Sequence, residues 1–278
     1  MLNAAVIYSS QNGSTQKVAK RIKNALISEG NKVSLFNTKQ KEKINIHDFD
    51  LIGIGSPTYI SRPSYEIMDF LDSIRDFSNK KVFTFVTYST EIGDGANWLR
   101  KKIKSLHGID AGHIACAGKN HFPGYTKYGY LFSPENPTNK EMVEIDLFVK
   151  DIISNNERDN SIERTSYDKK PDFIYRFERF VTNRFLIRTL YRNFFSFNRK
   201  LCTGCDLCIN SCPMKNIFKD KKNHKKLRND CILCLNCEIS CPQKAISSPL
   251  SSWLIFIPFL KLNIRKALKQ KIPYNRLL

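Results

Sequence analysis

The chain has 278 residues, of which 41% are hydrophobic, and it carries 45 Lys and Arg against 26 Asp and Glu. That length accommodates about two domains, and the apolar content excludes an intrinsically disordered chain. The longest strongly apolar run, residues 253–260, is too short to span a bilayer and includes Pro258. The first residues read as a strand rather than a secretory leader, so we expect a cytoplasmic protein.

The first 155 residues alternate strand patterns with helix patterns. Five strands are predicted, at 3–8, 32–37, 50–55, 81–88 and 113–118, and four helices, at 14–28, 64–77, 96–106 and 138–153. This alternation indicates an α/β fold with a doubly wound five-stranded parallel sheet. In such a sheet a ligand binds at the carboxyl ends of the strands, where the strand order reverses.

A loop rich in hydroxyl groups lies between the first predicted strand and the first predicted helix. A helix N-terminus presents free backbone N–H groups and a positive dipole end, which favour an anion. The loop lacks the lysine of a triphosphate loop and the G-x-G-x-x-G of a dinucleotide loop. We expect it to hold one phosphate with neutral donors, and the alternative is an ordinary helix N-cap. The candidate residues are Ser9, Ser10, Gln11, Asn12, Gly13, Ser14 and Thr15.

Two further loops follow the third and fourth predicted strands. The first of them reads GSPTYISRP and the second reads TYSTEIGDGANW, so they offer aromatic surfaces and glycines that allow close backbone approach. The alternative for Tyr59 and Tyr88 is that they are ordinary surface aromatics. The candidate binding residues in these loops are Pro57, Thr58, Tyr59, Ile60, Thr87, Tyr88, Ser89 and Gly93.

This combination resembles the flavodoxin family over residues 1–155. The segment SQNGST, residues 10–15, matches that family's T-x-T-G-N-T signature at the hydroxyl and glycine positions, whereas Asn12 and Ser14 depart from it. The segments GSPTY and GDGANW resemble the family's second and third loops. The resemblance implies bound FMN, with its phosphate on the first loop and its isoalloxazine between the other two.

Residues 156–198 are predicted to be a linker and a basic amphipathic helix. The stretch 155–172 is polar, and Arg184, Arg188 and Arg192 then recur at a spacing of four among apolar residues. Such a helix either braces two domains or lies on an acidic membrane surface. The basic and apolar tail, residues 249–278, leaves the same two alternatives open.

Eight of the nine cysteines form two copies of C-x2-C-x2-C-x3-C-P, offset by 29 residues. Three thiolates with two residues between successive cysteines can surround one face of a cubic iron–sulfur cluster, while the fourth points to the other cluster. A pair of zinc sites is the alternative, although zinc motifs do not need a third close cysteine. Residues 199–248 therefore resemble a bacterial two-cluster ferredoxin, which is a small α+β domain. We assign one [4Fe–4S] cluster to Cys202, Cys205, Cys208 and Cys241, and the other to Cys231, Cys234, Cys237 and Cys212.

The ninth cysteine, Cys116, lies on the last predicted strand, where we expect a core thiol. The excess of positive charge is largest in the C-terminal part of the chain, because residues 201–278 hold 14 Lys and Arg against 4 Asp and Glu. Basic surface attracts acidic partners. We expect acidic redox proteins, meaning a ferredoxin, a flavodoxin or a reductase, with peripheral membrane contact as the alternative. Nucleic acid is not expected, because no recognition motif accompanies the charge.

Three functions fit the sequence. The one we prefer is an electron-transfer protein that passes electrons between two [4Fe–4S] clusters and FMN within one chain, coupling one-electron and two-electron partners. The second is a flavin-dependent reductase of a quinone or nitro compound, for which Tyr125, Tyr128 and Tyr130 are the only local acid–base candidates. The third is a cluster-based sensory or regulatory protein.

Overall fold

The chain divides into two units, each built from two stretches of sequence. The computed structural model describes residues 1–154 and 173–277, so the predicted linker at 155–172 lies outside the described residues. The first unit comprises Met1–Lys119 and Glu135–Tyr175, and the second comprises Asn120–Pro134 and Arg176–Leu278. The domain limits 1–155, 156–198, 199–248 and 249–278 remain predictions.

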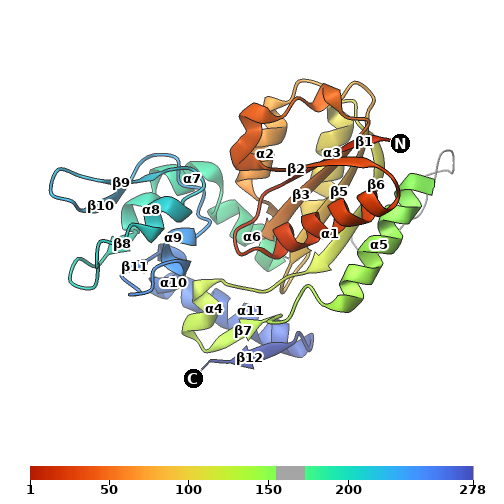
Figure 1. Ribbon diagram of the computed structural model, residues 1–278. Helices are drawn as coiled ribbons and strands as arrows, with labels where there is room; N and C mark the ends of the chain where they lie inside the picture. The colour runs from red at the N-terminus through yellow and green to blue at the C-terminus, as the bar shows by residue number, and fades with distance from the viewer. Residues whose placement is uncertain (155–172, 278) are drawn as a thin grey trace. The chain divides into compact units, whose positions relative to one another are not determined.

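A parallel sheet forms the centre of the first unit (Figure 1). Its strands lie in the order β2-β1-β3-β5-β6, and each pairs in parallel with its neighbours. The strand order reverses between β1 and β3, as in a doubly wound fold. The predicted α/β class is therefore confirmed. The strands are β1 (Asn3–Tyr8), β2 (Lys32–Asn37), β3 (Leu51–Tyr59), β5 (Lys81–Tyr88) and β6 (Ile109–Ala117).

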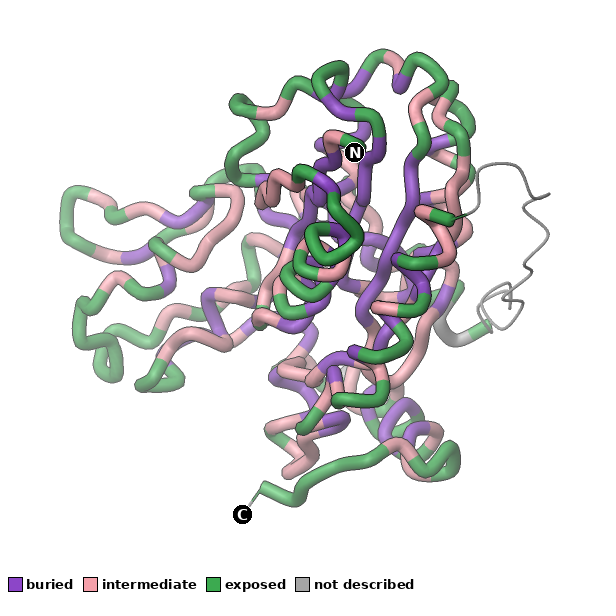
Figure 2. The backbone as a smooth tube through the Cα atoms, turned by 45° about the vertical axis from the view of Figure 1, so that its right-hand side comes forward, coloured by how far each residue is buried: buried purple, intermediate pink, exposed green. Residues whose placement is uncertain are grey.

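Helices cover both faces of this sheet. On one face α1 (Ser14–Ser28) and α5 (Asn139–Ser154) pack over a core that includes Phe83 and Phe85. On the other face α2 (Tyr65–Ser73) and α3 (Gly95–Ser105) pack over a second core. Two 3-10 turns, η1 (Thr38–Lys43) and η2 (Ile46–Asp48), connect β2 to β3. Because both faces are covered, the three central strands β1, β3 and β5 are buried almost throughout, whereas the edge strands β2 and β6 are only partly buried (Figure 2).

Two strands differ in length from their predictions. Strand β3 continues to Tyr59 and turns tightly into β4 (Arg62–Pro63), which pairs with it in antiparallel fashion. Strand β6 begins earlier than predicted, at Ile109. A register shift between Asp110 and Gly112, opposite Val82 and Phe83, interrupts its pairing with β5. The apolar pattern is broken there by Asp110 and Gly112, which is why periodicity alone places the start of the strand later.

Two glycines of β3 make room for the aromatic residues of the next strand. A Cβ atom on Gly53 would lie 2.3 Å from the ring of Phe83, and one on Gly55 would lie 2.0 Å from the ring of Phe85. Both rings are fully buried. The GIG pattern of β3 is therefore required by packing against β5 rather than by a turn.

The cysteine-rich part of the second unit repeats one small structure. In each half a cysteine motif leads into a short helix, which is α8 (Leu207–Ser211) or α9 (Asn236–Ile239). The strand that follows each motif belongs to a two-stranded antiparallel pairing, consistent with the predicted small α+β domain. The paired strands are β9 (Ile217–Lys219) with β10 (Lys225–Leu227), and β11 (Ile246–Ser247) with β8 (Ser196–Phe197).

The rest of the second unit joins the inserted segment Asn120–Pro134 to the C-terminal residues. Strand β7 (Tyr130–Phe132) pairs with β12 (Tyr274–Arg276), and Tyr125 is buried against Leu260. The sequence places this segment with the first 155 residues, but it belongs to the second unit. The remaining elements are α4 (Pro123–Lys127), α6 (Phe173–Val181), α7 (Arg184–Thr189), η4 (Tyr191–Phe194), α10 (Pro249–Ser252), η5 (Leu254–Phe256) and α11 (Ile257–Lys269).

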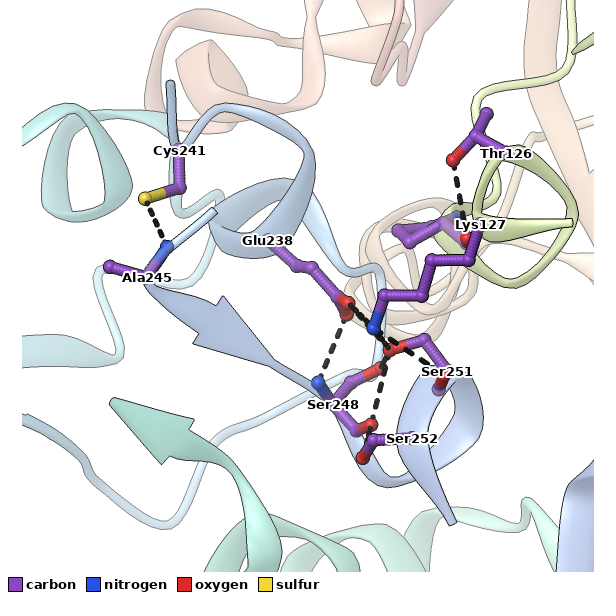
Figure 3. A network of polar contacts seen from close by, with 9 residues as sticks. Thr126, Lys127, Glu238, Cys241, Ala245, Ser248, Ser251 and Ser252 are labelled. Atoms are coloured by element: carbon purple, nitrogen blue, oxygen red, sulfur yellow. Dashed lines mark hydrogen bonds and ion pairs between the residues drawn. The ribbon is translucent and has the colours of Figure 1, made fainter. Parts of the chain in front are cut away.

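A polar network holds the inserted segment to the cysteine-rich part (Figure 3). The carboxylate of Glu238, next in sequence to Cys237, is almost fully buried. It accepts hydrogen bonds from the backbone N–H of Ser248, at 3.0 Å, and from the hydroxyl of Ser251. Lys127 of α4 pairs with the same carboxylate at 3.1 Å. Among the residues that the structure describes, no helix is long and apolar enough to cross a membrane.

We expect Gly53→Ala to lower the free energy of unfolding by about 1–3 kcal/mol, since the added methyl group overpacks the core against Phe83. Thermal unfolding followed by circular dichroism measures the change. Replacing Phe83 by Leu in the same chain should restore part of the loss. If Gly53→Ala alone left the transition unchanged, the packing argument for this glycine would be wrong.

Candidate functional site

The first loop, residues 9–15, bends around the start of α1. Gly13 has a φ of 87° and is the N-cap of the helix, with no side chain to cap it. The loop caps part of the first turn itself, because Asn12 Oδ1 accepts from the N–H of Ser14 at 3.0 Å and Ser10 Oγ accepts from that of Gln16 at 3.3 Å. The positive φ, rather than lack of space, demands glycine at position 13, since a Cβ there would meet nothing within 4 Å.

Hydroxyl pairs connect this loop to the other strand ends. The Oγ atoms of Ser9 and Ser64 lie 2.6 Å apart, and the Oγ1 atoms of Thr15 and Thr87 lie 2.7 Å apart. Ser9 and Thr15 are both buried. These contacts set the carboxyl ends of β1, β3 and β5 side by side, but they also direct the Ser9 hydroxyl inward, to Ser64.

The second loop is a tight hairpin between β3 and β4. Ile60 and Ser61, at its centre, have φ values of 48° and 58°. A β-branched residue in this region is strained, and such strain gathers at functional sites. Gly93 of the third loop packs directly on the hairpin, because a Cβ at that position would lie 2.4 Å from Ser61 Cα.

Three hydroxyl groups at these loops are buried and have no hydrogen-bond partner among the described residues. They are Thr58 Oγ1, Ser61 Oγ and Ser89 Oγ. A buried polar atom without a partner costs free energy, so native structures rarely leave one. Three of them at the ends of β3 and β5 indicate a polar ligand at this edge of the sheet.

The predicted binding residues of these loops come together at that edge, although not all in the same way. Pro57 and Thr87 are buried, whereas Thr58, Tyr59, Ile60, Tyr88 and Ser89 are half-buried. Sequence reasoning did not select Ser61, whose side chain is buried without a partner, or Ser64, which holds Ser9. Both lie within or beside the quoted loop GSPTYISRP, but a serine alone carries no signal of its orientation.

In the second unit, four cysteines line one cavity. Its lining includes Asp206 and Lys225 as well as the apolar residues Phe197 and Ile246. Three of the cysteines belong to the first motif and the fourth belongs to the second motif. They are Cys202, Cys205, Cys208 and Cys241.

The other four motif cysteines line a second cavity. Three of them come from the second motif and one from the first, so the fourth cysteine of each motif lies at the cavity of the other. They are Cys212, Cys231, Cys234 and Cys237. Within the described ranges, no group of three or more His, Cys, Asp or Glu is placed to hold a single metal ion.

Backbone N–H groups hold the two crossing cysteines. Asn216 donates to Cys212 Sγ at 3.2 Å, and Ala245 donates to Cys241 Sγ at 3.3 Å, which is drawn in Figure 3. The donors, like the acceptors, are 29 residues apart. Such bonds orient metal ligands and tune the group that they bind.

Burial raises the pKa of several of these thiols. The pKa of Cys231 is raised to about 11, chiefly by desolvation, and the pKa of Cys237 is raised well above its ordinary value for the same reason. Metal ligation requires thiolates, so binding at this cavity must release protons. Cys116, outside the motifs, is buried on β6, and desolvation raises its pKa to about 12. Its thiol is therefore protonated and packs as a core residue.

Two family models match separate parts of the chain. Residues 5–128 match the family model of the flavodoxin domain, and residues 201–246 match that of the 4Fe-4S dicluster domain. An uncharacterised protein of Methanocaldococcus jannaschii is 28% identical over 157 residues, which cover 55% of this chain and 100% of that protein.

Solved flavodoxin structures are also similar to part of the chain. A flavodoxin from the domain Archaea has 18% identity and a TM-score of 0.41, covering 54% of this chain and 95% of its own. Oxidised flavodoxin 1 from Bacillus cereus has 15% identity and a TM-score of 0.43, covering 54% of this chain and 97% of its own.

The flavodoxin domain implies FMN, and we expect Thr58→Val to weaken FMN binding by about tenfold, because a buried hydroxyl loses its ligand partner. Fluorescence titration of the apoprotein with FMN measures the affinity. Thr38→Val is the matched control, since Thr38 Oγ1 is also buried without a partner among the described residues but lies outside the three loops. Equal affinities of the two variants would contradict the placement.

Proposed function

We propose that this chain, in which a flavodoxin domain is joined to a 4Fe-4S dicluster domain, is an electron-transfer protein that passes electrons between two [4Fe–4S] clusters and one FMN. The two domains themselves support a redox role. The observation that carries the finer proposal is the pair of cavities, each lined by four of the eight motif cysteines. When bound, FMN exchanges one or two electrons and each cubane exchanges one.

The crossed placement of the fourth cysteines supports two clusters rather than two zinc sites. Zinc sites built from C-x2-C pairs need only two cysteines from each segment. Here Cys241 lies with the first motif and Cys212 with the second, each held by a backbone N–H. We assign one cluster to Cys202, Cys205, Cys208 and Cys241, and the other to Cys231, Cys234, Cys237 and Cys212.

In the first unit, the three loops would hold FMN with neutral groups. We assign its phosphate to the start of α1, where the Ser10 hydroxyl accepts a hydrogen bond from the N–H of Gln16 and can still donate its own hydrogen. The unpartnered hydroxyls of Thr58, Ser61 and Ser89 support placing the rest of the ligand between the second and third loops. The Ser9 and Thr15 hydroxyls hold the strand ends in position, since both already bond within the protein.

The proposed partners are acidic redox proteins, namely a ferredoxin, a flavodoxin or a reductase. Residues 201–278 hold 14 Lys and Arg but only 4 Asp and Glu, and this supports the choice, because a basic surface attracts acidic proteins. Exposed phenylalanines of α6 and α7, among them Phe173, Phe180 and Phe185, keep peripheral membrane contact as a second candidate. Binding to vesicles with and without acidic lipid separates the two.

Metal analysis of the protein purified without oxygen tests the cluster assignment. We expect about eight irons and about eight inorganic sulfides per chain, together with one FMN. Cys212→Ala should halve the iron content, whereas the control Cys116→Ala should leave it unchanged. Cys116 is buried in the sheet of the first unit, so the control removes a thiol of no predicted metal role.

Double variants show which cysteines share a cluster. Adding Cys234→Ala to Cys212→Ala should remove no further iron, and adding Cys205→Ala should remove the rest. The reverse result would contradict the crossed assignment. A chain that binds clusters but no flavin would favour a regulatory role, and steady reduction of a quinone or nitro compound would favour the reductase.

A further inference from the structure

The two cavities differ at positions that the internal repeat makes equivalent. Asp206 precedes α8 and Leu235 precedes α9, with an offset of 29 residues. Both have left-handed backbone, with φ of 60° and 62°. Asp206 lines the first cavity and Leu235 lines the second. A charged residue therefore stands beside one cavity where an apolar residue stands beside the other.

The strand pairings identify a second pair of equivalent positions. Leu227 pairs with Ile217 in one half, as Phe197 pairs with Ile246 in the other, and Ile217 and Ile246 are 29 residues apart. Two residues before Leu227 is Lys225, which lines the first cavity. Two residues before Phe197 is Phe195, which lines the second. The repeat thus has lysine and phenylalanine at matching places.

Lys225 is a buried cation, with a side chain only 5% exposed. Its Nζ pairs with Asp206 Oδ1, and Lys219 Nζ pairs with Asp206 Oδ2 at 2.5 Å. Two ammonium groups thus share one carboxylate, which leaves one net positive charge beside the first cavity.

The second cavity has a more apolar lining, with Met214, Ile217 and Ile232 among its residues. Its charged lining residue is Asp230, which is exposed and pairs with Arg188 at 2.8 Å. Cys231 and Cys237 are buried there, whereas Cys202 and Cys205 at the first cavity are exposed. Water and positive charge both stabilise an added negative charge, so both differences act in the same direction.

We propose that Lys225, which occupies the position equivalent to Phe195 in the repeat, raises the reduction potential of the cluster at the first cavity above that of the cluster at the second. This inference rests on the proposed function. Uptake of one electron from a low-potential one-electron donor adds one negative charge next to the cysteine thiolates, and the Lys225 ammonium stabilises that charge. Electrons entering the second unit therefore collect at the cluster of Cys202, Cys205, Cys208 and Cys241.

A redox titration of the loaded protein, followed by electron paramagnetic resonance, tests this order. The half-loaded variants Cys212→Ala and Cys205→Ala assign the two signals. We expect Lys225→Met to make reduction of the first cluster about tenfold less favourable, a shift of 59 mV for one electron, and to leave the second cluster unchanged. Lys226→Met is the matched control, because it removes the same charge from a neighbouring exposed side chain that pairs with Asp220.

Asp206→Asn provides a second variant with the opposite sign. Asparagine tolerates the left-handed backbone at this position, and loss of the carboxylate should raise the potential of the first cluster. Equal potentials of the two wild-type clusters, or equal effects of Lys225→Met and Lys226→Met, would overturn the inference while leaving the proposed function intact. A wild-type protein that binds no clusters would instead overturn the proposed function.

Discussion

The exchange of the fourth cysteine between the two motifs is the constraint on which the second unit depends. Cys212 and Cys241 each line the cavity formed by the other motif. Neither half therefore supplies all four cysteines of a cavity by itself. The hydroxyls of Ser211 and Ser240, also 29 residues apart, meet at 2.9 Å beside this exchange. Cysteines of both motifs belong to the small core around Ile217 and Ile246, so the proposed clusters would contribute to the stability of this core.

The chain passes between the two units more than once. It leaves the first unit after Lys119, returns at Glu135 and leaves again after Tyr175. Asn12 of the first loop donates a hydrogen bond to the Lys119 carbonyl at 2.6 Å, so the loop contacts the residue before the first crossing. Lys127, within the insertion, pairs with Glu238 next to Cys237.

Local sequence predicted the elements whose signals are local. The bounds of β1 and α1 match their predictions because an unbroken apolar run meets a glycine turn and then a helical period. The sequence did not predict the end of β3, because the hairpin at Ile60 and Ser61 contains neither the asparagine nor the glycine that a turn with positive φ prefers.

Other features depend on contacts between distant residues. The pairing of β7 with β12 joins residues more than a hundred positions apart, which no periodicity reveals. Lys225 belongs to the run KDKKNHKKLR, where every lysine looks solvated, and only the hairpin shows that this one is buried. The hydroxyl-rich first loop predicts a site at the carboxyl ends of the strands, but its sequence does not show which hydroxyls are already bonded within the protein.

The central claim is that electrons move between the clusters and FMN inside one molecule. Stopped-flow reduction of the loaded protein by a low-potential donor, recorded at flavin and cluster wavelengths, tests it most directly. The account predicts that cluster reduction is followed by flavin reduction at a rate that stays constant as the protein concentration is raised about tenfold. A rate that rises in proportion to the protein concentration would show transfer between molecules and contradict the claim.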